Sequence, residues 1–470
     1  MSESAESAEV LLVKPAVAPP LDPYFRPIAL GQRAYARAVA DSKRGVPLAL
    51  ALERNDGQTS VFQTQIAAPG THLDDATRRY VERLVKFLLW QIGGWKLTVG
   101  APREIGDFLS ATYSRQGARA FDVQLLERVY ERPFIVETVD LAQVPAARES
   151  SVALGGHLDG CRIGFDLGAS DYKLAAVRDG EPVFTTEIPW DPKDQADPGW
   201  HHRKINEGLK LAAQHLPRVD AIGGSSAGIY IDNRVMVASL FRAVPAAIFA
   251  SQVKPLFLNL QKEWGVPLEV ANDGDVTALA GAMSLKVNGV LGVALGSSQA
   301  AGFLDQHGCI TGWLNELAFA PVDLNPFAPA DEWSGDFGCG VQYFSQQAVG
   351  RLLVPAGIDV DPKLGLPEKL KQVQALMAQG DVRARKLYET IGVYLGYAVA
   401  QYATMYHYRH MLVLGRVTTG DGGEVIVSKA TEVLRTEFPE LASALSLHLP
   451  DEKSKRVGQA VAAASLPKLP

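Results

Sequence analysis

The pattern of apolar and polar positions divides the chain into two regions. Up to about residue 142, apolar runs of differing period predict a mixture of strands and helices. From about residue 160 onward, short apolar strands with glycine-rich ends alternate with helices, which is typical of α/β layers. Residues 143–158 lie between them, are rich in Gly, Ser and Ala and lack periodicity, which favours a linker.

The N-terminal region predicts a small domain of its own. The runs VPLALALE and TSVFQTQIA flank Arg54-Asn55-Asp56-Gly57, which is a hairpin signal because Gly tolerates positive φ at the turn. A helix with Asp74 or Asp75 as its N-cap is expected next, and its apolar positions are Val81, Leu84, Val85, Leu88 and Leu89. WKLTVGAP predicts a strand and residues 118–131 a second helix. The order β-β-α-β-α favours an α/β or α+β domain.

We expect that domain to span residues 23–150 and to follow a tail, residues 1–22. The tail is acidic and then Pro-rich, and we predict it to be flexible because it has too few apolar side chains to pack. Beyond the linker, the segments 161–180 and 289–308 each consist of an apolar strand, a turn of small residues and a second apolar strand. That recurrence predicts two related halves.

Length and composition bound the function. The chain has 470 residues, 47% of them apolar, which is enough for about three domains at roughly 100–200 residues each and excludes wholesale disorder. Its 46 Lys and Arg against 52 Asp and Glu argue against a nucleic-acid binder. Three cysteines are too few for a disulfide framework or a four-Cys zinc site. The acidic N-terminus is unlike a signal peptide, and Gln401, Thr404 and His407 interrupt the least charged window, so we expect a cytoplasmic protein without a membrane span.

Two turns of small residues are candidate phosphate sites. Asp166 ends an apolar strand, and Gly168, Ala169 and Ser170 follow it in a turn whose backbone N–H groups a phosphate can approach. A carboxylate beside such a turn can hold the water shell of Mg²⁺. The alternative is an ordinary β-hairpin, and this segment alone leaves both open. The second turn, Gly296-Ser297-Ser298, offers the same chemistry, and two opposed phosphate loops would form a clamp.

A candidate general base lies between the two turns. VPLEVA predicts a strand, and Asn272-Asp273-Gly274-Asp275 opens a helix. A carboxylate at such a strand end is well placed to accept the proton of a substrate hydroxyl. The alternative role is N-capping, which Asp and Asn favour. We expect one of the two acids to cap the helix and Asp273 to face the cleft.

In this order, the motifs resemble those of the ROK family of sugar kinases (repressor, open reading frame, kinase), within the actin/hexokinase-like superfamily. The run Asp166 to Ser170 resembles the first phosphate motif, and Gly296-Ser297-Ser298 stands where the second phosphate loop usually has Gly-Thr-Gly. Asn272-Asp273 resembles the pair in which Asp is the general base and Asn binds the sugar. The resemblance covers residues 160–468.

Three further segments carry the resemblance. The stretch Ile222 to Gly228 looks like the sugar-side loop, and Gly312 to Phe319 resembles the G-E-x-G-H segment, so that Glu316 falls on a sugar-hydroxyl ligand. The stretch VGQAVAAAS at 457–465 is similar to the family's returning helix.

The resemblance implies an α/β fold of two actin-like (ribonuclease H-like) lobes with a cleft between them, beside the N-terminal domain. The lobes would be residues 160–270 with a returning helix at 455–467, and residues 271–454. The implied activity is ATP-dependent phosphorylation of a sugar hydroxyl, with Mg²⁺, Asp273 as general base and a possible homodimer. The implied sugar-binding residues are Asn272, Glu316, Ser226, Ala227 and Gly228. The implied ATP and Mg²⁺ residues are Asp166, Gly168, Ala169, Ser170, Lys173, Gly296, Ser297, Ser298, Gly415 and Arg416.

The chain also departs from the family. ROK proteins typically bind a structural zinc through a His, here Phe319, and a cysteine motif of which Cys339 alone remains, so we predict no zinc. Arg416 stands where the family has a second Gly and can stack on an adenine or obstruct it. These departures keep a second hypothesis open, a sugar- or nucleotide-binding protein without kinase activity. A sugar-responsive repressor would need a DNA-binding head, and the N-terminal region shows no helix-turn-helix pattern with a basic recognition helix.

Overall fold

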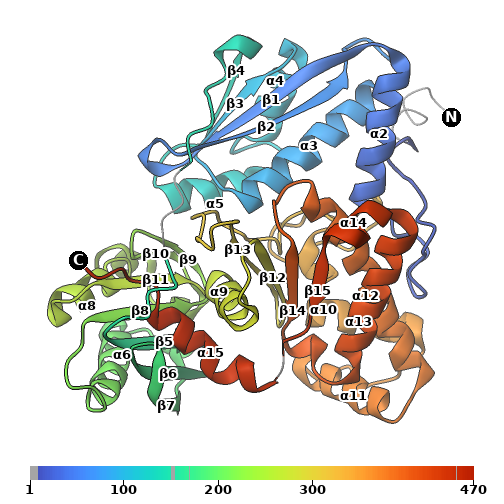
Figure 1. The fold of residues 1–470 in the computed structure, drawn as a ribbon. Coiled ribbons are helices and arrows are strands. Elements are labelled where there is room, and N and C mark those ends of the chain that lie inside the picture. Colours follow the sequence, from blue (N-terminus) through green and yellow to red (C-terminus); the bar gives the residue numbers. More distant parts are fainter. Residues whose placement is uncertain (1–8, 150–153, 169, 451) are drawn as a thin grey trace.

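The computed structural model describes residues 9–149, 154–168, 170–450 and 452–470, and Figure 1 shows that they form three α/β units. Each unit is built on one main sheet. The N-terminal sheet has the strand order β2-β1-β3-β4, the first lobe has β11-β8-β5-β6-β7, and the second lobe has β13-β12-β14-β15. The fold is therefore the expected pair of lobes with an additional N-terminal domain.

The N-terminal domain contains the hairpin that the sequence predicts. Its two strands pair antiparallel from Gly45–Ala67 to Glu53–Thr59, and Asp56 and Gly57 in the connection both have positive φ. The elements are α2 (Ile28–Ser42), β1 (Gly45–Glu53), β2 (Thr59–Ala67), α3 (Asp74–Gln91), β3 (Lys96–Gly100), α4 (Arg103–Thr112), α5 (Ala120–Tyr130) and β4 (Ile135–Val139). Helices α2 and α4 and strand β4 were not predicted from the sequence.

The first lobe carries the turn after Asp166. Its elements are β5 (Cys161–Leu167), β6 (Asp171–Arg178), β7 (Glu181–Pro189), α6 (Pro198–Ala213), β8 (Ala221–Ser226), β9 (Ile229–Ile231), β10 (Arg234–Val237), α7 (Ala246–Ile248), α8 (Leu256–Trp264), β11 (Leu268–Asn272) and the returning helix α15 (Glu452–Ala464). A Cβ atom on Gly164 would lie 1.8 Å from the carbonyl oxygen of Ala460, and one on Gly223 would lie 1.7 Å from that of Ala463. Only glycine therefore lets α15 approach the sheet this closely.

The second lobe repeats the topology of the first. In both, an antiparallel hairpin (β5-β6, β12-β13) is followed by a parallel strand beside its first member (β8, β14) and then by another parallel strand (β11, β15). This confirms the two related halves expected from the recurrence of 161–180 at 289–308. The elements are α9 (Asp273–Leu285), β12 (Val290–Leu295), β13 (Gln299–Leu304), α10 (Gln346–Ala356), α11 (Leu366–Ala378), α12 (Val382–Ala403), β14 (His410–Leu414), α13 (Asp421–Glu437), α14 (Pro439–Ala444) and β15 (Ser446–His448).

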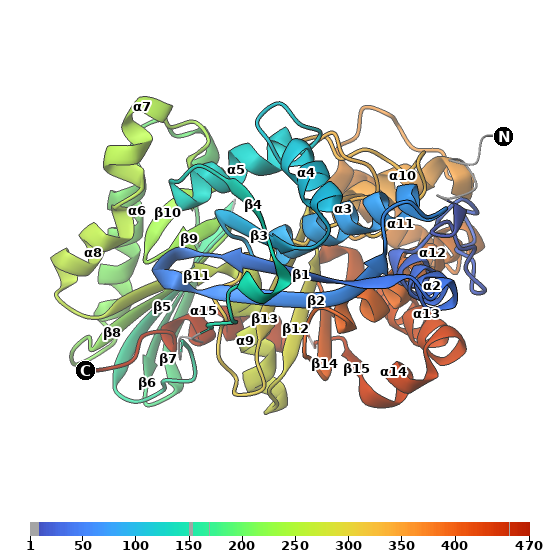
Figure 2. The same cartoon turned by 90° about the horizontal axis from the view of Figure 1, so that it is seen from above.

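The N-terminal domain lies across both lobes (Figure 2). One face of α3 belongs to the core of its own domain, through residues such as Leu84 and Leu88. Its other face joins the core of the second lobe, through Phe87 and Trp90. A helix that is apolar on both faces is buried between layers, so α3 joins the domain to the second lobe.

The described part of the expected tail packs on the second lobe, contrary to the prediction. The backbone N–H of Val17 donates to the Tyr397 hydroxyl, and Asp22 accepts a hydrogen bond of 2.6 Å from Tyr394 on α12. Phe25 follows, 1% exposed, with its ring 4.8 Å from that of Tyr394. Few but well-placed apolar and hydrogen-bonding groups are sufficient here because α12 provides the partners.

No helix in the described ranges has the length and apolar character needed to cross a bilayer. Helix α12, which contains most of the least charged window, is instead a core helix of the second lobe.

Candidate active site

Parallel strands bring the predicted polar residues to one edge of the first lobe's sheet. Asp166 on β5 is in register with Ser225 on β8, and Ser226 is in register with Asn272 on β11. Because the carboxyl ends of parallel strands meet at the same edge, three motifs far apart in the sequence form one cluster.

Asp166 is buried, and each of its two carboxylate oxygens has a polar partner. Its Oδ1 accepts a hydrogen bond of 2.7 Å from the Ser225 hydroxyl, and its Oδ2 lies 3.3 Å from the ammonium of Lys173. Burial raises the pKa of Asp166, while Lys173 and Ser225 lower it. The structure thus groups the predicted Lys173 with Asp166.

Asn272, and neither acid, caps helix α9. Its Oδ1 accepts from the backbone N–H of Gly274 at 2.7 Å, and its Nδ2 donates to the carbonyl oxygen of Gly228 at 2.7 Å. The expectation that one of the two acids caps the helix is therefore wrong. The amide succeeds because its two ends bind the helix and the 226–228 loop together, whereas a carboxylate can only accept.

Asp275 is instead a buried anchor. Its Oδ1 accepts from the backbone N–H of Phe303 at 3.1 Å and from Asn315 Nδ2 at 3.0 Å. The hydroxyl of Tyr406 donates to Asn315 Oδ1 at 3.0 Å. Asn315 adopts a left-handed conformation, φ 52°, directly before Glu316. The start of α9 is therefore connected to the segment that carries Glu316.

Three neighbouring carboxyl groups have raised pKa values. Burial, and then the charge of Asp166, raises the pKa of Asp273 to about 6. Burial, and then Asp273 and Asp275, raises the pKa of Glu316 to about 7. Burial raises the pKa of Asp275 to about 7, opposed by its bonds to Phe303 and Asn315. Such a group of carboxyls, poised near neutral pH, is typical of sites that transfer protons.

The 226–228 loop is held by neighbouring side chains. Ser226 Oγ accepts a hydrogen bond of 2.6 Å from Tyr230, which also contacts the carbonyl oxygen of Ala227 at 3.3 Å. Gly228 has φ 134°, and a Cβ there would lie 2.4 Å from the carbonyl oxygen of Val237, so the position requires glycine. The loop is thus fixed beside Asn272.

The predicted phosphate turns lie at strand ends of different lobes. Gly168 donates its backbone N–H to Asp171 O at 3.0 Å, and the hydroxyl of Ser170 donates to Asp171 Oδ2 at 2.9 Å. Ala169 lies outside the described residues. In the second lobe, Gly296 donates to Ser298 O at 2.9 Å in the exposed turn formed by Gly296, Ser297 and Ser298.

Gly415 and Arg416, the ATP-binding residues predicted after β14, adjoin the second phosphate turn. A Cβ on Gly415, which has φ 99°, would lie 2.5 Å from the carbonyl oxygen of Leu295, the residue before Gly296. Arg416 follows, and its carbonyl oxygen accepts a hydrogen bond of 2.9 Å from Gln374. The structure therefore brings together the ends of β12 and β14.

Sequence reasoning missed several residues of this cluster. Gln459 on α15 donates to Ser225 Oγ at 3.0 Å and to the carbonyl oxygen of Asp273 at 3.3 Å. Asn315 and Tyr230 were also missed. For Gln459 the only available signal was a lone Gln in the Ala-rich run VGQAVAAAS, a pattern that predicts a helix and no site residue.

Phe319 and Cys339, which stand at positions of the family's zinc motif, are packed against other side chains. Phe319 stacks on Trp90 with ring centroids 4.3 Å apart, and Cys339 is fully buried, with burial raising the pKa of its thiol to about 12. Within the described ranges, no group of three or more His, Cys, Asp or Glu side chains is arranged to hold a metal ion.

Comparison with known proteins shows what this fold resembles. No protein-family model matches the sequence, and no curated protein matches it. The crystal structure of a ROK hexokinase from Thermus thermophilus superposes with a TM-score of 0.50 at 18% identity, over 64% of this chain and 97% of that one. That of a ROK family transcriptional regulator, a homolog of the E. coli MLC protein, gives a TM-score of 0.54 at 18% identity, over 78% of this chain and 89% of that one.

The chain has the ROK fold. This confirms the two actin-like lobes that the motifs predicted. The ROK fold carries a kinase in one of these structures and a regulator in the other, so any activity has to be argued from the site.

Proposed function

We propose that this protein is a ROK family sugar kinase, which transfers the γ-phosphoryl group of ATP to a hydroxyl of a hexose or N-acetylhexosamine. The observation that carries the proposal is the half-buried carboxyl of Asp273 at the start of α9, between Asp166 and Glu316, with a pKa raised to about 6. Such a carboxyl is ionised at neutral pH and basic enough to accept a hydroxyl proton.

In the proposed reaction, the sugar hydroxyl oxygen attacks the γ-phosphorus while its proton passes to the carboxylate of Asp273. The bond from the γ-phosphorus to the β–γ bridging oxygen breaks, and ADP leaves with the electron pair. Asn272, Glu316 and the loop Ser226 to Gly228 orient the sugar. Because phosphoryl transfer requires the attacking and leaving oxygens in line, this positioning supplies much of the rate.

The remaining predicted residues are assigned to the triphosphate. The backbone N–H groups of the turns after Asp166 and Leu295 would bind phosphate oxygens, with Lys173 as a cation beside the first turn and Gly415 and Arg416 beside the adenosine. The proximity of Asp166 and Asp273, which raises the pKa of Asp273, is a concentration of negative charge that fits a divalent cation. Asp166 would hold Mg²⁺, which when bound neutralises charge on the phosphate oxygens.

The test is an ADP-release assay with MgATP over a panel of hexoses and N-acetylhexosamines. We expect one or a few sugars to stimulate ADP release well above the rate with ATP alone, and the stimulated rate to depend on Mg²⁺. A panel in which no sugar raises ADP release, although sugars bind, would contradict the proposal.

One observation favours a second function, sugar binding without phosphorylation. Asp166 already forms an ion pair with Lys173 and a hydrogen bond with Ser225, which leaves its carboxylate less available to Mg²⁺. Thermal-shift measurements with each sugar, with and without MgATP, separate the two functions. Stabilisation by a sugar with no effect of MgATP supports the binding protein, whereas stabilisation by both ligands supports the kinase.

A further inference from the structure

Helix α3 of the N-terminal domain ends directly against the segment that carries Glu316. The backbone N–H of Glu316 donates to the carbonyl oxygen of Trp90 at 2.9 Å, and that of Asn315 donates to Gln91 at 2.9 Å. The N–H of Leu314 donates to Ile92 at 3.4 Å. The last carbonyls of a helix have no partners within the helix. The segment 314–316 therefore closes the end of α3, and α3 in turn fixes its backbone.

Side chains at the same end of α3 strengthen this contact. The indole of Trp90 stacks on Phe319 at a centroid distance of 4.3 Å, and its Nε1 donates to Asp122 Oδ1 on α5 at 2.8 Å. Gln91 Nε2 donates to the carbonyl oxygen of Met405 at 2.7 Å. Phe319, at the end of the 314–319 segment, and Met405, from another part of the second lobe, thus both contact the end of α3.

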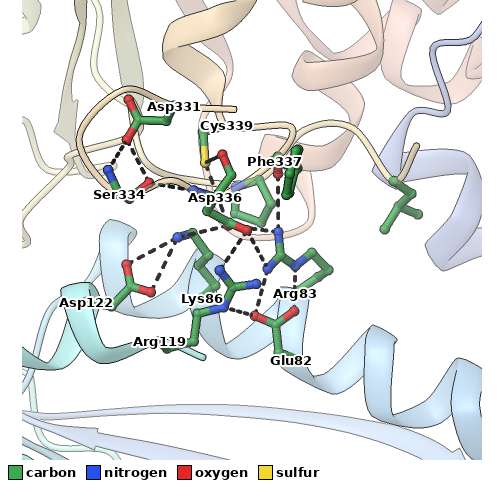
Figure 3. Close-up of polar contacts among 12 residues, drawn as sticks. Glu82, Arg83, Lys86, Arg119, Asp122, Asp331, Ser334, Asp336, Phe337 and Cys339 are labelled. Atoms are coloured by element: carbon green, nitrogen blue, oxygen red, sulfur yellow. Dashed lines mark hydrogen bonds and ion pairs between the residues drawn. The ribbon is translucent and has the colours of Figure 1, made fainter. Parts of the chain in front are cut away.

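One turn earlier, charged side chains of α3 join a buried group of charges that Figure 3 shows, here called the α3 ion cluster. Its six members are Glu82, Arg83, Lys86, Arg119, Asp122 and Asp336. Lys86 has no exposed side-chain surface, and its Nζ lies 3.0 Å from Asp336 and 3.2 Å from Asp122. Three cations and three anions balance, so removal of any one member leaves a buried charge without its partner, which is destabilising.

Asp336 is the only member of the α3 ion cluster that belongs to the second lobe. Its carboxylate forms ion pairs with Arg83 at 2.9 Å, Arg119 at 2.7 Å and Lys86 at 3.0 Å. Just after it, the backbone N–H of Gly340 donates to Ala320 at 2.9 Å, and that of Val341 donates to Ala318 at 2.9 Å. Two backbone hydrogen bonds therefore connect the segment that begins at Asp336 to Ala318 and Ala320, which follow Glu316.

From these contacts we propose that the N-terminal domain completes the sugar site, with Lys86 and Trp90 as positioning residues that hold Glu316 in place from α3. This inference rests on the proposed function for the role of Glu316, but its structural part can be measured without activity. One end of the Glu316 segment is bonded to the end of α3 and the other is tied to the α3 ion cluster, so the carboxyl is presented by two domains together.

The test compares wild type with Lys86→Met, which removes the charge between Asp122 and Asp336, and with Glu131→Gln as the matched control. Glu131 also docks the N-terminal domain, through ion pairs with Arg234 and Lys254 of the first lobe, but is not part of the α3 ion cluster. Two properties are measured, backbone hydrogen exchange of residues 314–316 and the KM values for sugar and for MgATP. Trp90→Phe, which keeps a ring but loses the N–H to Asp122, takes the place of Lys86→Met if that variant does not fold.

We expect Lys86→Met to accelerate exchange at residues 314–316 and to raise the KM for sugar by about tenfold, the cost of one misaligned hydrogen bond to a charged group. The KM for MgATP and the exchange in β12 should stay at the wild-type values, and Glu131→Gln should change neither sugar KM nor exchange at 314–316. Unchanged exchange and unchanged sugar KM in Lys86→Met, or in Trp90→Phe where it takes the place of Lys86→Met, would overturn the inference. If wild type phosphorylates no sugar, the proposed function fails, and the exchange data alone decide whether α3 holds the segment.

Discussion

Gln459 donates a hydrogen bond of 3.0 Å to Ser225, the residue whose hydroxyl in turn holds Asp166. The same amide contacts the carbonyl oxygen of Asp273 at 3.3 Å. A side chain from the C-terminal helix α15 therefore connects the backbone of Asp273, the proposed base, to the Ser225 hydroxyl that holds Asp166, the proposed Mg²⁺ ligand.

The contact predicts that Gln459→Leu lowers kcat more than it changes the stability of the protein. The variant loses both hydrogen bonds of the amide; each neutral hydrogen bond is worth about 1 kcal/mol, and about 1 kcal/mol lost in the transition state lowers kcat roughly fivefold. Steady-state kinetics and urea unfolding measure the two effects. Gln214→Leu at the exposed end of α6 is the control, and equal kcat values for the two variants would contradict the prediction.

The raised pKa values of three carboxyl groups predict that stability declines as pH rises from about 4 to about 7. Asp273, Asp275 and Glu316 have folded-state pKa values of about 6, 7 and 7, above their ordinary values, so the folded protein binds more protons than the unfolded chain between pH 4 and pH 7. The free energy of unfolding must then decrease through this window. Urea unfolding at a series of pH values measures it.

Asp275→Asn tests the same point at a single residue. Asn Oδ1 can still accept from Phe303 and Asn315, whereas the buried charge is removed. Each unit of raised pKa corresponds to about 1.4 kcal/mol, so the variant should be more stable than wild type at pH 8 by a few kcal/mol and similar to it at pH 4. A variant that is less stable at pH 8 would show that Asp275 is ionised and needed in that form.

The pKa of Asp273 also predicts the pH dependence of catalysis. The proposed base accepts a proton only when it is ionised, so kcat/KM should rise with pH on the acidic side, with a midpoint near pH 6. A pH–rate profile between pH 5 and pH 8 with the best sugar measures it. A profile that is flat below pH 7 would contradict the assignment of this carboxyl.

The N-terminal segment before α2 should stabilise the second lobe. Asp22 lies 3.3 Å from Arg351 and 2.6 Å from the Tyr394 hydroxyl, and all three side chains are largely buried. Asp22→Ala leaves Arg351 without this partner and should lower the free energy of unfolding by about 1.5–3 kcal/mol. The exposed Asp359→Ala is the control, and an equally small change in both variants would exclude a role for the segment.

Local signals were sufficient for much of the fold. The hairpin at Arg54 to Gly57 and the strand after Trp95 follow from alternation and turn residues, and the two lobes follow from the recurrence of one strand-turn-strand pattern. The strand ends also gave most of the candidate site, because parallel strands of one sheet bring Asp166, Ser226 and Asn272 to a common edge.

What the sequence could not provide are contacts between distant segments. Lys86 reads as a polar residue on an amphipathic helix, and only the fold places it beside Asp336, which lies far along the chain. The cap of α9 was misassigned because Asn272 and Asp273 are both good capping residues, and the choice depends on the carbonyl of Gly228 in another loop. The tail was misjudged for the same reason, since its partners are on α12.

The central claim is that Asp273 is the general base of a sugar kinase, and the most direct measurement is the rate of sugar phosphate formation by wild type and Asp273→Asn. Sugar binding by both proteins, measured by calorimetry, shows that the site is intact. We predict that the variant binds sugar as wild type does and forms sugar phosphate slower by a factor of about 10²–10⁴. A variant that binds the sugar and forms sugar phosphate at the wild-type rate would contradict the account.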